Sequence, residues 1–237
     1  MKKEKIIVAL DVPTKSAAKE IITELRDEVG AFKIGLQLFT SAGASFVKEV
    51  VNEGVKIFLD VKFHDIPNTV AKASVEVAKL GVWMFNIHIL GGAEMMQTTV
   101  NEVGEFCNKE NLKQPKIIGV TILTSLDEKS LEQLGMDYNI QKQVVNLAKL
   151  SDECGLDGVV ASPQEINMIR KNIAKDDFLI VTPGIRPSFA TNEDQKRVMT
   201  PADAVREGSD FLVIGRPITK ADDKIKAVRQ IIDEIIL

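Results

Sequence analysis

Residues 55–69 read VKIFLDVKFHDIPNT, and the same order of a strand, a polar strand end and a helix start recurs along the chain. The first five residues are mostly apolar and predict a buried strand. Because residues two apart on a strand point to the same face, Asp60 and Lys62 project together, and Asp65 follows just past the strand end. The stretch predicts an ammonium group held among carboxylates, which keeps a lysine charged and oriented.

Opposite charges two residues apart on a strand are often only a solvated surface pair, worth little. Here the preceding strand is apolar, and Pro67, which suits the first turn of a helix, comes soon after the charges. Charges at the end of a buried strand are costly unless they are paired or used. We therefore favour a functional site over a surface ion pair.

Composition limits the class of protein. The chain has 237 residues, of which 45% are hydrophobic and 27% charged, as in ordinary globular proteins. A net charge of -4 provides no basic surface for nucleic acid, and no apolar run has the length that crosses a membrane. Cys107 and Cys154 form no CxxC or disulfide pattern, which indicates a reducing compartment and a cytoplasmic location. No linker divides the chain, so we expect one domain spanning residues 1–237.

Strand-like and helix-like segments alternate along the whole chain. Apolar runs predict eight strands, at 6–10, 31–35, 55–60, 82–88, 116–121, 158–161, 178–181 and 211–214. Helix-period segments follow them at 14–27, 39–53, 68–80, 92–110, 139–154, 163–174, 201–207 and 219–236. Strict alternation with short loops implies parallel strands, and eight such units predict a (β/α)8 TIM barrel. A doubly wound open sheet is the alternative, but no glycine-rich dinucleotide fingerprint follows the first strand.

Polar residues concentrate at the predicted carboxyl ends of the strands, where barrels of this type carry their sites. The candidates at these ends are Asp11, Lys33, Asp60, Lys62, His88, Thr121 to Ser125, Ser162, Arg186 and Arg216. Lys33 would neighbour Asp60 on the next strand, which predicts a chain of alternating charges from Lys33 to Asp65. This concentration at one rim indicates an enzyme.

The loops after the last two strands predict a phosphate site, as is common in such barrels. They read PGIR at 183–186 and GRP at 215–217. Glycine lets backbone amides approach an anion, and arginine adds bidentate donors. A surface turn with an arginine is the simpler interpretation of either loop, but two such loops at this position favour an anion site.

The two histidines do not predict a metal site. His64 precedes Asp65 and His88 precedes two glycines, with no HxH or HExxH spacing. We expect both histidines to be structural, and we expect no metal and no cofactor.

The motif D-x-K-x-x-D-I-P-N-T at 60–69 resembles the signature of the orotidine 5′-monophosphate decarboxylase family. Weaker matches follow in the family's order over the whole chain, at 10–12, 32–35, 86–92, 121–125, 182–186, 194–197 and 210–217. Ile89 and Leu90 depart from the pattern, since smaller residues are expected before the glycine pair. The resemblance implies a (β/α)8 barrel that converts orotidine 5′-monophosphate to uridine 5′-monophosphate and carbon dioxide in de novo pyrimidine biosynthesis, without a cofactor.

The resemblance also implies residue roles. Lys62 would be the general acid that protonates ring carbon 6 after carbon dioxide leaves, flanked by Asp60 and Asp65, with Asp65 reaching in from the other subunit of a homodimer. Lys33 would complete the charge network and, with Asp11, contact the ribose. The other implied contacts are Thr69 at the partner's ribose, Thr124 or Ser125 at the pyrimidine, Gln195 at base and phosphate, and Arg186, Gly215 and Arg216 at the phosphate.

The chemistry of the residues agrees with these roles. Loss of carbon dioxide from an sp² ring carbon leaves a carbanion in the ring plane with no electron sink, and a fixed ammonium can stabilise that charge and then deliver a proton. The polar segment 184–200 is expected to close over the phosphate, so that contacts far from the reacting carbon drive closure.

Two other functions remain open. Metal-dependent sugar-phosphate decarboxylases or aldolases of the same barrel superfamily share the Asp-x-Lys-x-x-Asp core but use magnesium, and we expect them to lack the Ile-Pro-Asn-Thr continuation. A nucleotide-binding barrel without catalysis is the third interpretation, and the intact set of Asp60, Lys62 and Asp65 argues against it. Turnover in the presence of a chelator separates these functions.

Overall fold

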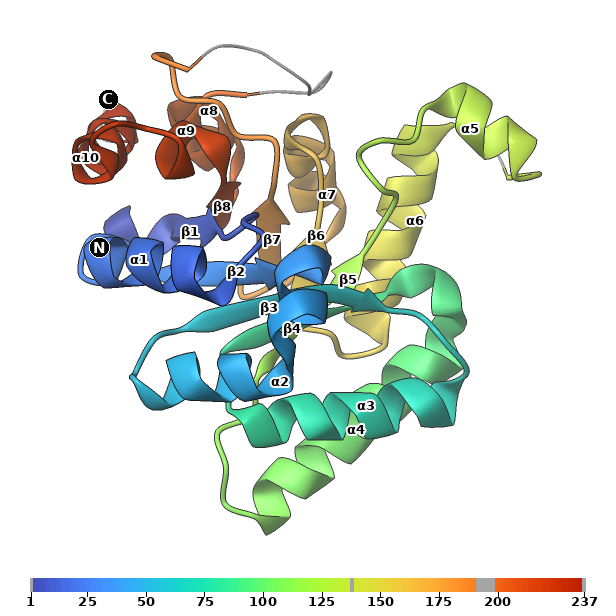
Figure 1. The fold of residues 1–237 in the computed structure, drawn as a ribbon. Helices are drawn as coiled ribbons and strands as arrows, with labels where there is room; N and C mark the ends of the chain where they lie inside the picture. The colour runs from blue at the N-terminus through green and yellow to red at the C-terminus, as the bar shows by residue number, and fades with distance from the viewer. Residues whose placement is uncertain (1, 137–138, 191–198, 236–237) are drawn as a thin grey trace.

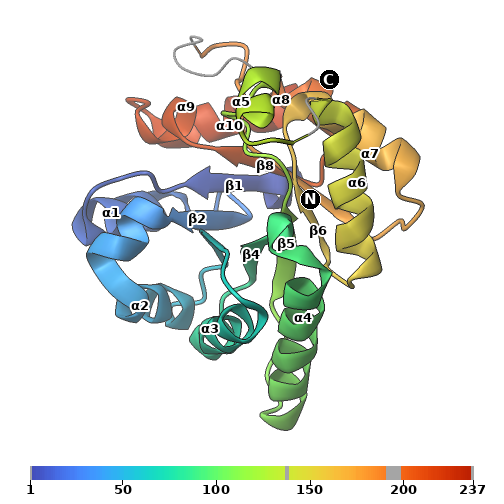
Figure 2. The same ribbon diagram turned by 90° about the vertical axis from the view of Figure 1, so that its right-hand side faces the viewer.

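Eight parallel strands close into a barrel with helices around its outside in the computed structural model, which describes residues 2–136, 139–190 and 199–235 (Figure 1, Figure 2). The strands are β1 (Ile6–Ala9), β2 (Ala31–Gly35), β3 (Ile57–Phe63), β4 (Met84–His88), β5 (Lys116–Val120), β6 (Gly158–Val160), β7 (Leu179–Thr182) and β8 (Phe211–Ile214). They pair in sequence order, and β1 also pairs with β8, so the sheet has no free edge. The predicted (β/α)8 barrel is confirmed.

The helices follow the strands in the expected order. They are α1 (Lys15–Leu25), α2 (Leu36–Asn52), α3 (Pro67–Leu80), α4 (Gly92–Lys109), α5 (Glu128–Gln133), α6 (Ile140–Glu153), α7 (Ile166–Asn172), α8 (Pro201–Glu207), α9 (Arg216–Thr219) and α10 (Lys224–Glu234), with 3-10 turns η1 (Lys2–Lys5), η2 (Ile89–Gly91) and η3 (Pro163–Glu165). The sequence did not predict α5 and α9, because six and four residues are too short to establish a helical period. In the described part of the chain, no helix is both long and apolar enough to cross a membrane.

Local sequence determines where several helices begin and end. Thr14 precedes α1, and its Oγ1 accepts a hydrogen bond from the Ala17 amide at 3.2 Å, an amide that the helix itself leaves unpaired. Gly81 ends α3 and Gly208 ends α8 in the left-handed conformation, which glycine adopts at little cost. The predicted helix ends at residues 80 and 207 are confirmed.

Alternate residues of the strands face the interior of the barrel. A buried interior cluster contains Ile7, Ala9, Ala31, Phe58, Met84, Ile118, Val181 and Val213. Lys33, Asp60 and Asn86 each follow one of these residues by two positions on the same strand, and therefore continue its inward face toward the carboxyl end. The barrel interior is thus apolar toward the amino ends of the strands and charged at the carboxyl rim.

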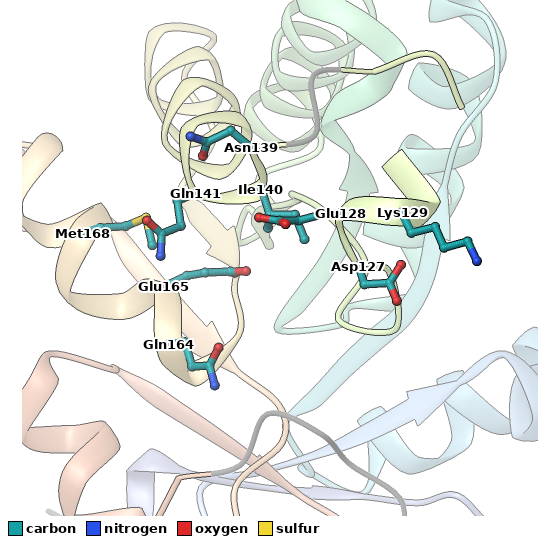
Figure 3. A pocket seen from close by; sticks show the side chains of 9 residues that line it. All are labelled: Asp127, Glu128, Lys129, Asn139, Ile140, Gln141, Gln164, Glu165 and Met168. Carbon is teal, nitrogen blue, oxygen red and sulfur yellow. The ribbon is translucent and has the colours of Figure 1, made fainter. Parts of the chain in front are cut away.

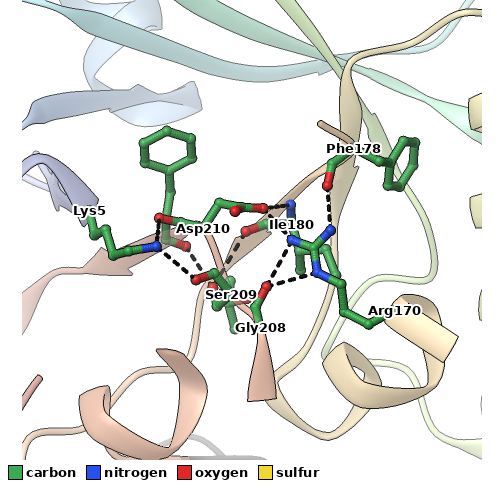
Figure 4. A network of polar contacts seen from close by, with 9 residues as sticks. Lys5, Arg170, Phe178, Ile180, Gly208, Ser209 and Asp210 are labelled. Carbon is green, nitrogen blue, oxygen red and sulfur yellow. Dashed lines mark hydrogen bonds and ion pairs between the residues drawn. The ribbon is translucent and has the colours of Figure 1, made fainter. Parts of the chain in front are cut away.

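Arg170 of α7 ties together the segments that lead into β7 and β8 (Figure 4). Its guanidinium forms an ion pair with Asp210, donates to the Gly208 carbonyl through Nε at 3.0 Å and Nη2 at 2.8 Å, and donates to the Phe178 carbonyl at 2.5 Å. Asp210 Oδ2 also accepts the Ile180 amide at 2.7 Å. This network fixes the amino ends of the two strands whose carboxyl ends carry the predicted phosphate loops.

Arg170→Ala is expected to lower the free energy of unfolding by about 2–3 kcal/mol, because the half-buried Asp210 loses its charged partner and two carbonyls lose their donors. For a chain of this length, the melting temperature should fall by about 4–10 °C. Thermal unfolding followed by circular dichroism measures the change. Arg206→Ala is the matched control, since it removes only an exposed ion pair to Asp203, and exposed pairs contribute little to stability. If both variants lost the same small amount of unfolding free energy, the structural role of Arg170 would be contradicted.

Candidate active site

Four charged side chains from three neighbouring strands meet at the carboxyl rim of the barrel. Lys33 Nζ, on β2, lies 3.2 Å from Asp11 Oδ1 beyond β1 and 3.3 Å from Asp60 Oδ2 on β3. Lys62 Nζ lies 2.7 Å from Asp60 Oδ1. The Asp60 carboxylate therefore holds one ammonium on each oxygen, and the charges alternate from Asp11 through Lys33 and Asp60 to Lys62.

Asp65 lies outside this network within the chain. It is exposed, its Oδ1 accepts the Ile66 amide at 2.7 Å, and it makes no ion pair with the described residues. Asp65 comes two residues after the end of β3, so it does not continue the inward face of that strand. Within one chain the second carboxylate of the network is Asp11, whereas the resemblance implies Asp65 from the other subunit of a homodimer.

Burial and pairing together set the ionisation of Asp60. Burial by itself would raise the pKa of this carboxyl, but Lys33, Lys62 and a hydrogen bond from Asn86 hold the pKa below its usual value. Asp60 is therefore a carboxylate at neutral pH. Its contribution to folding stability is present above the unfolded-state pKa and is lost as the pH falls through the lower folded-state pKa.

The backbone at Lys62 departs from regular strand geometry. Residues 60–62 lie opposite the single residue Asn86 of β4, because the register of β3 against β4 shifts there. Lys62 has a φ of 53°, in the left-handed region that residues other than glycine seldom adopt. Asp60 and Lys62 do meet, as predicted, but they meet through a bulge and not through simple alternation.

Gly35 leaves room for the buried ammonium. A Cβ at this position would lie 3.0 Å from Lys33 Nζ and 3.6 Å from Asp11 Oδ1. Lys33 is only 8% exposed, so its ammonium depends on the space beside Gly35 and on its two carboxylate partners.

A cavity of about 160 Å³ opens beside the charge network. Lys33, Asp60 and Lys62 form its charged wall. The other lining residues are mostly apolar: Phe58, Val120, Ile122, Leu123, Thr124, Val160, Pro183 and Val213. The cavity suits a flat ring with one edge against the Lys62 ammonium.

A second hollow, of about 290 Å³, lies at the loops after β7 and β8 and is lined by both arginines predicted for phosphate. Arg186 and Arg216 share it with Lys220, which gives it three cationic side chains. Gly215 precedes Arg216, and a Cβ on Gly215 would lie 3.6 Å from Asp11 Oδ2. The cationic hollow therefore adjoins the charge network, as a phosphate site at one end of a nucleotide would.

Asp65, Thr69 and Ser125, all predicted for the site, line neither the cavity nor the cationic hollow. Thr69, in the first turn of α3, is exposed, as is Asp65 just before that helix. Ser125 is also exposed, and its neighbour Thr124 is the one that lines the cavity. Gln195 lies outside the described residues.

His64 and His88 stack on each other, with ring centroids 5.0 Å apart and an interplanar angle of 22°. Burial, aided by His64 and Lys62, lowers the pKa of His88 to about 4, so this ring is neutral at pH 7 and adds no positive charge beside Lys62. Within the described residues, no group of three or more His, Cys, Asp or Glu side chains is arranged to hold a metal ion.

A larger hollow, with a volume of about 570 Å³, lies elsewhere, between α5, α6 and the η3–α7 segment (Figure 3). It is lined by Asp127, Glu128, Lys129, Asn139, Ile140, Gln141, Gln164, Glu165 and Met168. None of the residues predicted for the site is among them. Its lining residues include one lysine and three carboxylic side chains, so it lacks the excess of cations that a phosphorylated ligand requires.

Asn86 belongs to the site, although the sequence analysis did not name it as a site residue. Its side chain is fully buried, donates through Nδ2 to Asp60 Oδ1 at 2.7 Å and accepts the Lys62 amide at 2.8 Å. The sequence did contain a signal for Asn86: it is a polar residue in the middle of the apolar run 82–88, two positions after Met84.

The fold and the site together define a class: a (β/α)8-barrel protein whose site is a lysine-centred charge network at the carboxyl rim, next to a cationic hollow. The chain belongs to the Orotidine 5'-phosphate decarboxylase / HUMPS family, whose profile matches residues 4–231.

Individual relatives are similar to this chain along its whole length. Orotidine 5'-phosphate decarboxylase of Pelobacter propionicus is 52% identical over 234 residues, which cover 99% of this chain and 96% of that protein. The protein of the same name from Geobacter sulfurreducens is 52% identical over 235 residues, covering 99% and 97%. The crystal structure of orotidine 5'-phosphate decarboxylase from Lactobacillus acidophilus superimposes with a TM-score of 0.86 at 37% identity, covering 98% of this chain and 99% of that one.

Proposed function

We propose that this protein decarboxylates orotidine 5′-monophosphate to uridine 5′-monophosphate, with residues 1–237 acting as a single catalytic domain that needs no cofactor. The observation that carries the proposal is the Lys62 ammonium, held 2.7 Å from Asp60 on the wall of a ring-sized cavity. Relatives about 50% identical over their full length bear the name of this activity, which favours it over the sugar-phosphate alternative.

Lys62 is the proton donor in the proposed mechanism. The bond between ring carbon 6 and the carboxylate carbon breaks, carbon dioxide leaves, and the electron pair stays on carbon 6. The adjacent ammonium stabilises this charge, because it is already oriented by Asp60 and needs no reorganisation during the reaction. Lys62 then gives a proton to carbon 6 and recovers one from solvent.

The rest of the nucleotide extends from the cavity toward the cationic hollow. Arg186 and Arg216 bind the phosphate, with the Gly215 backbone beside them, and Gln195 bridges base and phosphate. Lys33, which lines the cavity, and its ion-pair partner Asp11 contact the ribose. The last contact is at the pyrimidine edge, where Thr124 is favoured over Ser125 because Thr124 lines the cavity.

The active protein is a homodimer in this proposal, with Asp65 and Thr69 contributed to the partner's site. Both residues are exposed and lie outside the cavity of their own chain, which supports a role in the neighbouring one. Exposed apolar side chains follow the ends of three consecutive strands, β2, β3 and β4: Leu36 is 58% exposed, Ile66 67% and Leu90 42%. Such a group of apolar residues at one rim is typical of a protein interface.

The activity is tested by the fall in ultraviolet absorbance as orotidine 5′-monophosphate is consumed, with a chelator present throughout. We expect turnover in the ordinary enzymatic range, about 1–10³ s⁻¹, at undiminished rate after chelation. Parallel assays with magnesium and pentulose or hexulose phosphates test the metal-dependent alternative. A folded protein that consumes only the sugar phosphates, or that binds uridine 5′-monophosphate without turning over its carboxylated precursor, would overturn the proposal.

A further inference from the structure

We infer that Asn86 is the positioning residue of this site: one buried amide holds the Asp60 carboxylate and the strained backbone of Lys62 in the geometry that aims the ammonium into the cavity. The inference rests on the proposed function and extends it to a residue on β4 that does not line the cavity itself.

Asn86 binds the bulged backbone at Lys62. The bulge at residues 60–62 places the Lys62 amide where the strand ladder offers it no regular partner, and Asn86 Oδ1 accepts it at 2.8 Å. Without Asn86 this half-buried amide would lack a partner, which would destabilise the bulged conformation. The φ of 53° at Lys62 adds strain that persists only where the surroundings enforce it. The Asn86 carbonyl oxygen is thus what makes this backbone conformation favourable.

Asn86 also orients the Asp60 carboxylate. Asn86 Nδ2 donates to Asp60 Oδ1 at 2.7 Å, and the same oxygen accepts from Lys62 Nζ at 2.7 Å. The opposite oxygen faces Lys33 at 3.3 Å. Asn86 therefore sets the rotation of the carboxylate that divides its two oxygens between the two ammonium groups.

Only a primary amide side chain of this length can hydrogen-bond to the Lys62 amide and to the Asp60 carboxylate at the same time. Its oxygen accepts the backbone amide and its nitrogen donates to a carboxylate, without adding a charge to a network that is already balanced. An aspartate would keep the acceptor but place a second carboxylate against Asp60, which raises the pKa of one of the pair. An alanine would leave both the Lys62 amide and one Asp60 oxygen without this partner.

The test compares Asn86→Ala and Asn86→Asp with the parent. Because displacement of a reacting group by about 1 Å can cost about 10²-fold in rate, we expect kcat to fall by about that factor in both variants. The dissociation constant for uridine 5′-monophosphate, measured by calorimetry, should stay near the parent value, because the phosphate and ribose contacts are elsewhere. The acid limb of the kcat profile should move to higher pH, since Asp60, faced by Lys33 and Lys62, loses the hydrogen bond that helps keep it ionised.

Ser151→Ala is the matched control, because it removes a hydrogen bond from another fully buried polar side chain, Ser151 Oγ to the Gly158 carbonyl at 3.4 Å. It should lower the melting temperature without changing kcat or the pH profile. Loss of stability with unchanged kcat in both Asn86 variants would make Asn86 merely structural and overturn the inference. Asn86→Asp, equal in size to the parent residue, carries the kinetic test should Asn86→Ala fail to fold.

Crystal structures of the two variants make the inference independent of turnover. We expect Lys62 to leave its left-handed φ and its ammonium to move away from Asp60 in Asn86→Ala. Unchanged Lys62 geometry in that variant would contradict the inference even if the parent is an active decarboxylase. An inactive parent would instead contradict the proposed function, and the Lys62 geometry of the variants would still decide the role of Asn86.

Discussion

Lys62→Ala is expected to lower kcat for orotidine 5′-monophosphate by at least about 10⁴-fold. The variant loses both a proton donor and a preoriented positive charge, and general acid catalysis alone contributes about 10²–10⁴-fold. Binding of uridine 5′-monophosphate should weaken far less, because the phosphate hollow and Lys33 are untouched. Stopped and continuous absorbance assays measure kcat, and calorimetry measures binding of the product.

A second variant of Lys62 separates its positive charge from its role as proton donor, and a variant of another lysine serves as the control. Lys62→Arg keeps a positive charge, but its guanidinium does not release a proton near neutral pH, so this variant should also be nearly inactive. Lys116→Ala removes a lysine whose ammonium lies 2.6 Å from Asp157 at the other end of a strand, and it should behave like the parent. Substantial turnover by Lys62→Arg would show that the lysine supplies charge only, and substantial turnover by Lys62→Ala would remove it from the mechanism.

Mixing two inactive variants should restore activity if Asp65 acts in the partner's site. Lys62→Ala and Asp65→Ala each disable both sites of their own homodimer. In a mixed dimer, one site loses both residues, but the other has Lys62 from one subunit and Asp65 from its partner. Statistical exchange of subunits should therefore recover about a quarter of the parent activity, as expected for a symmetric dimer with two shared sites.

The control for this experiment mixes Lys62→Ala with Asp60→Ala. Lys62 and Asp60 form an ion pair within one chain, so no combination of these subunits yields an intact site, and activity should stay at its low level. Differently tagged subunits, co-purified after exchange, verify that mixed dimers are present. Mixed dimers without recovery for the Lys62 and Asp65 variants would place Asp65 in its own chain, and a monomeric active protein would exclude the shared site.

Several parts of the site could be predicted because they depend on local periodicity. Period-two alternation placed Asp60 and Lys62 on one face, and the order of the strands brought Lys33 beside Asp60. The ion pair of Lys33 with Asp60 confirms the second expectation. Lys62 also pairs with Asp60, but through the bulge in β3 and not through simple alternation. Glycine and arginine at the last two strand ends likewise predicted a shared cationic hollow.

Other parts depend on contacts between strands, which periodicity does not encode. Asn86 sits opposite the bulge only because β4 pairs with β3 in a shifted register, and nothing near Asn86 in the sequence signals that shift. Asp11 joins the network because closure of the barrel sets β1 against both β2 and β8. Within one chain Asp65 stays outside the network because it lies in the loop between the end of β3 and the start of α3.

The amino-acid pattern alone determined the order of strands and helices, the closed (β/α)8 architecture and the rim at which charged side chains gather. These features follow from apolar spacing and strand-end polarity, which are properties of short segments. Tertiary structure alone decided the left-handed backbone at Lys62, the hydrogen bonds of the buried Asn86 amide and the ion pair of Asp11 with Lys33. Hydrogen bonds and ion pairs act over about 3 Å, so a shift of one residue in strand register changes every partner.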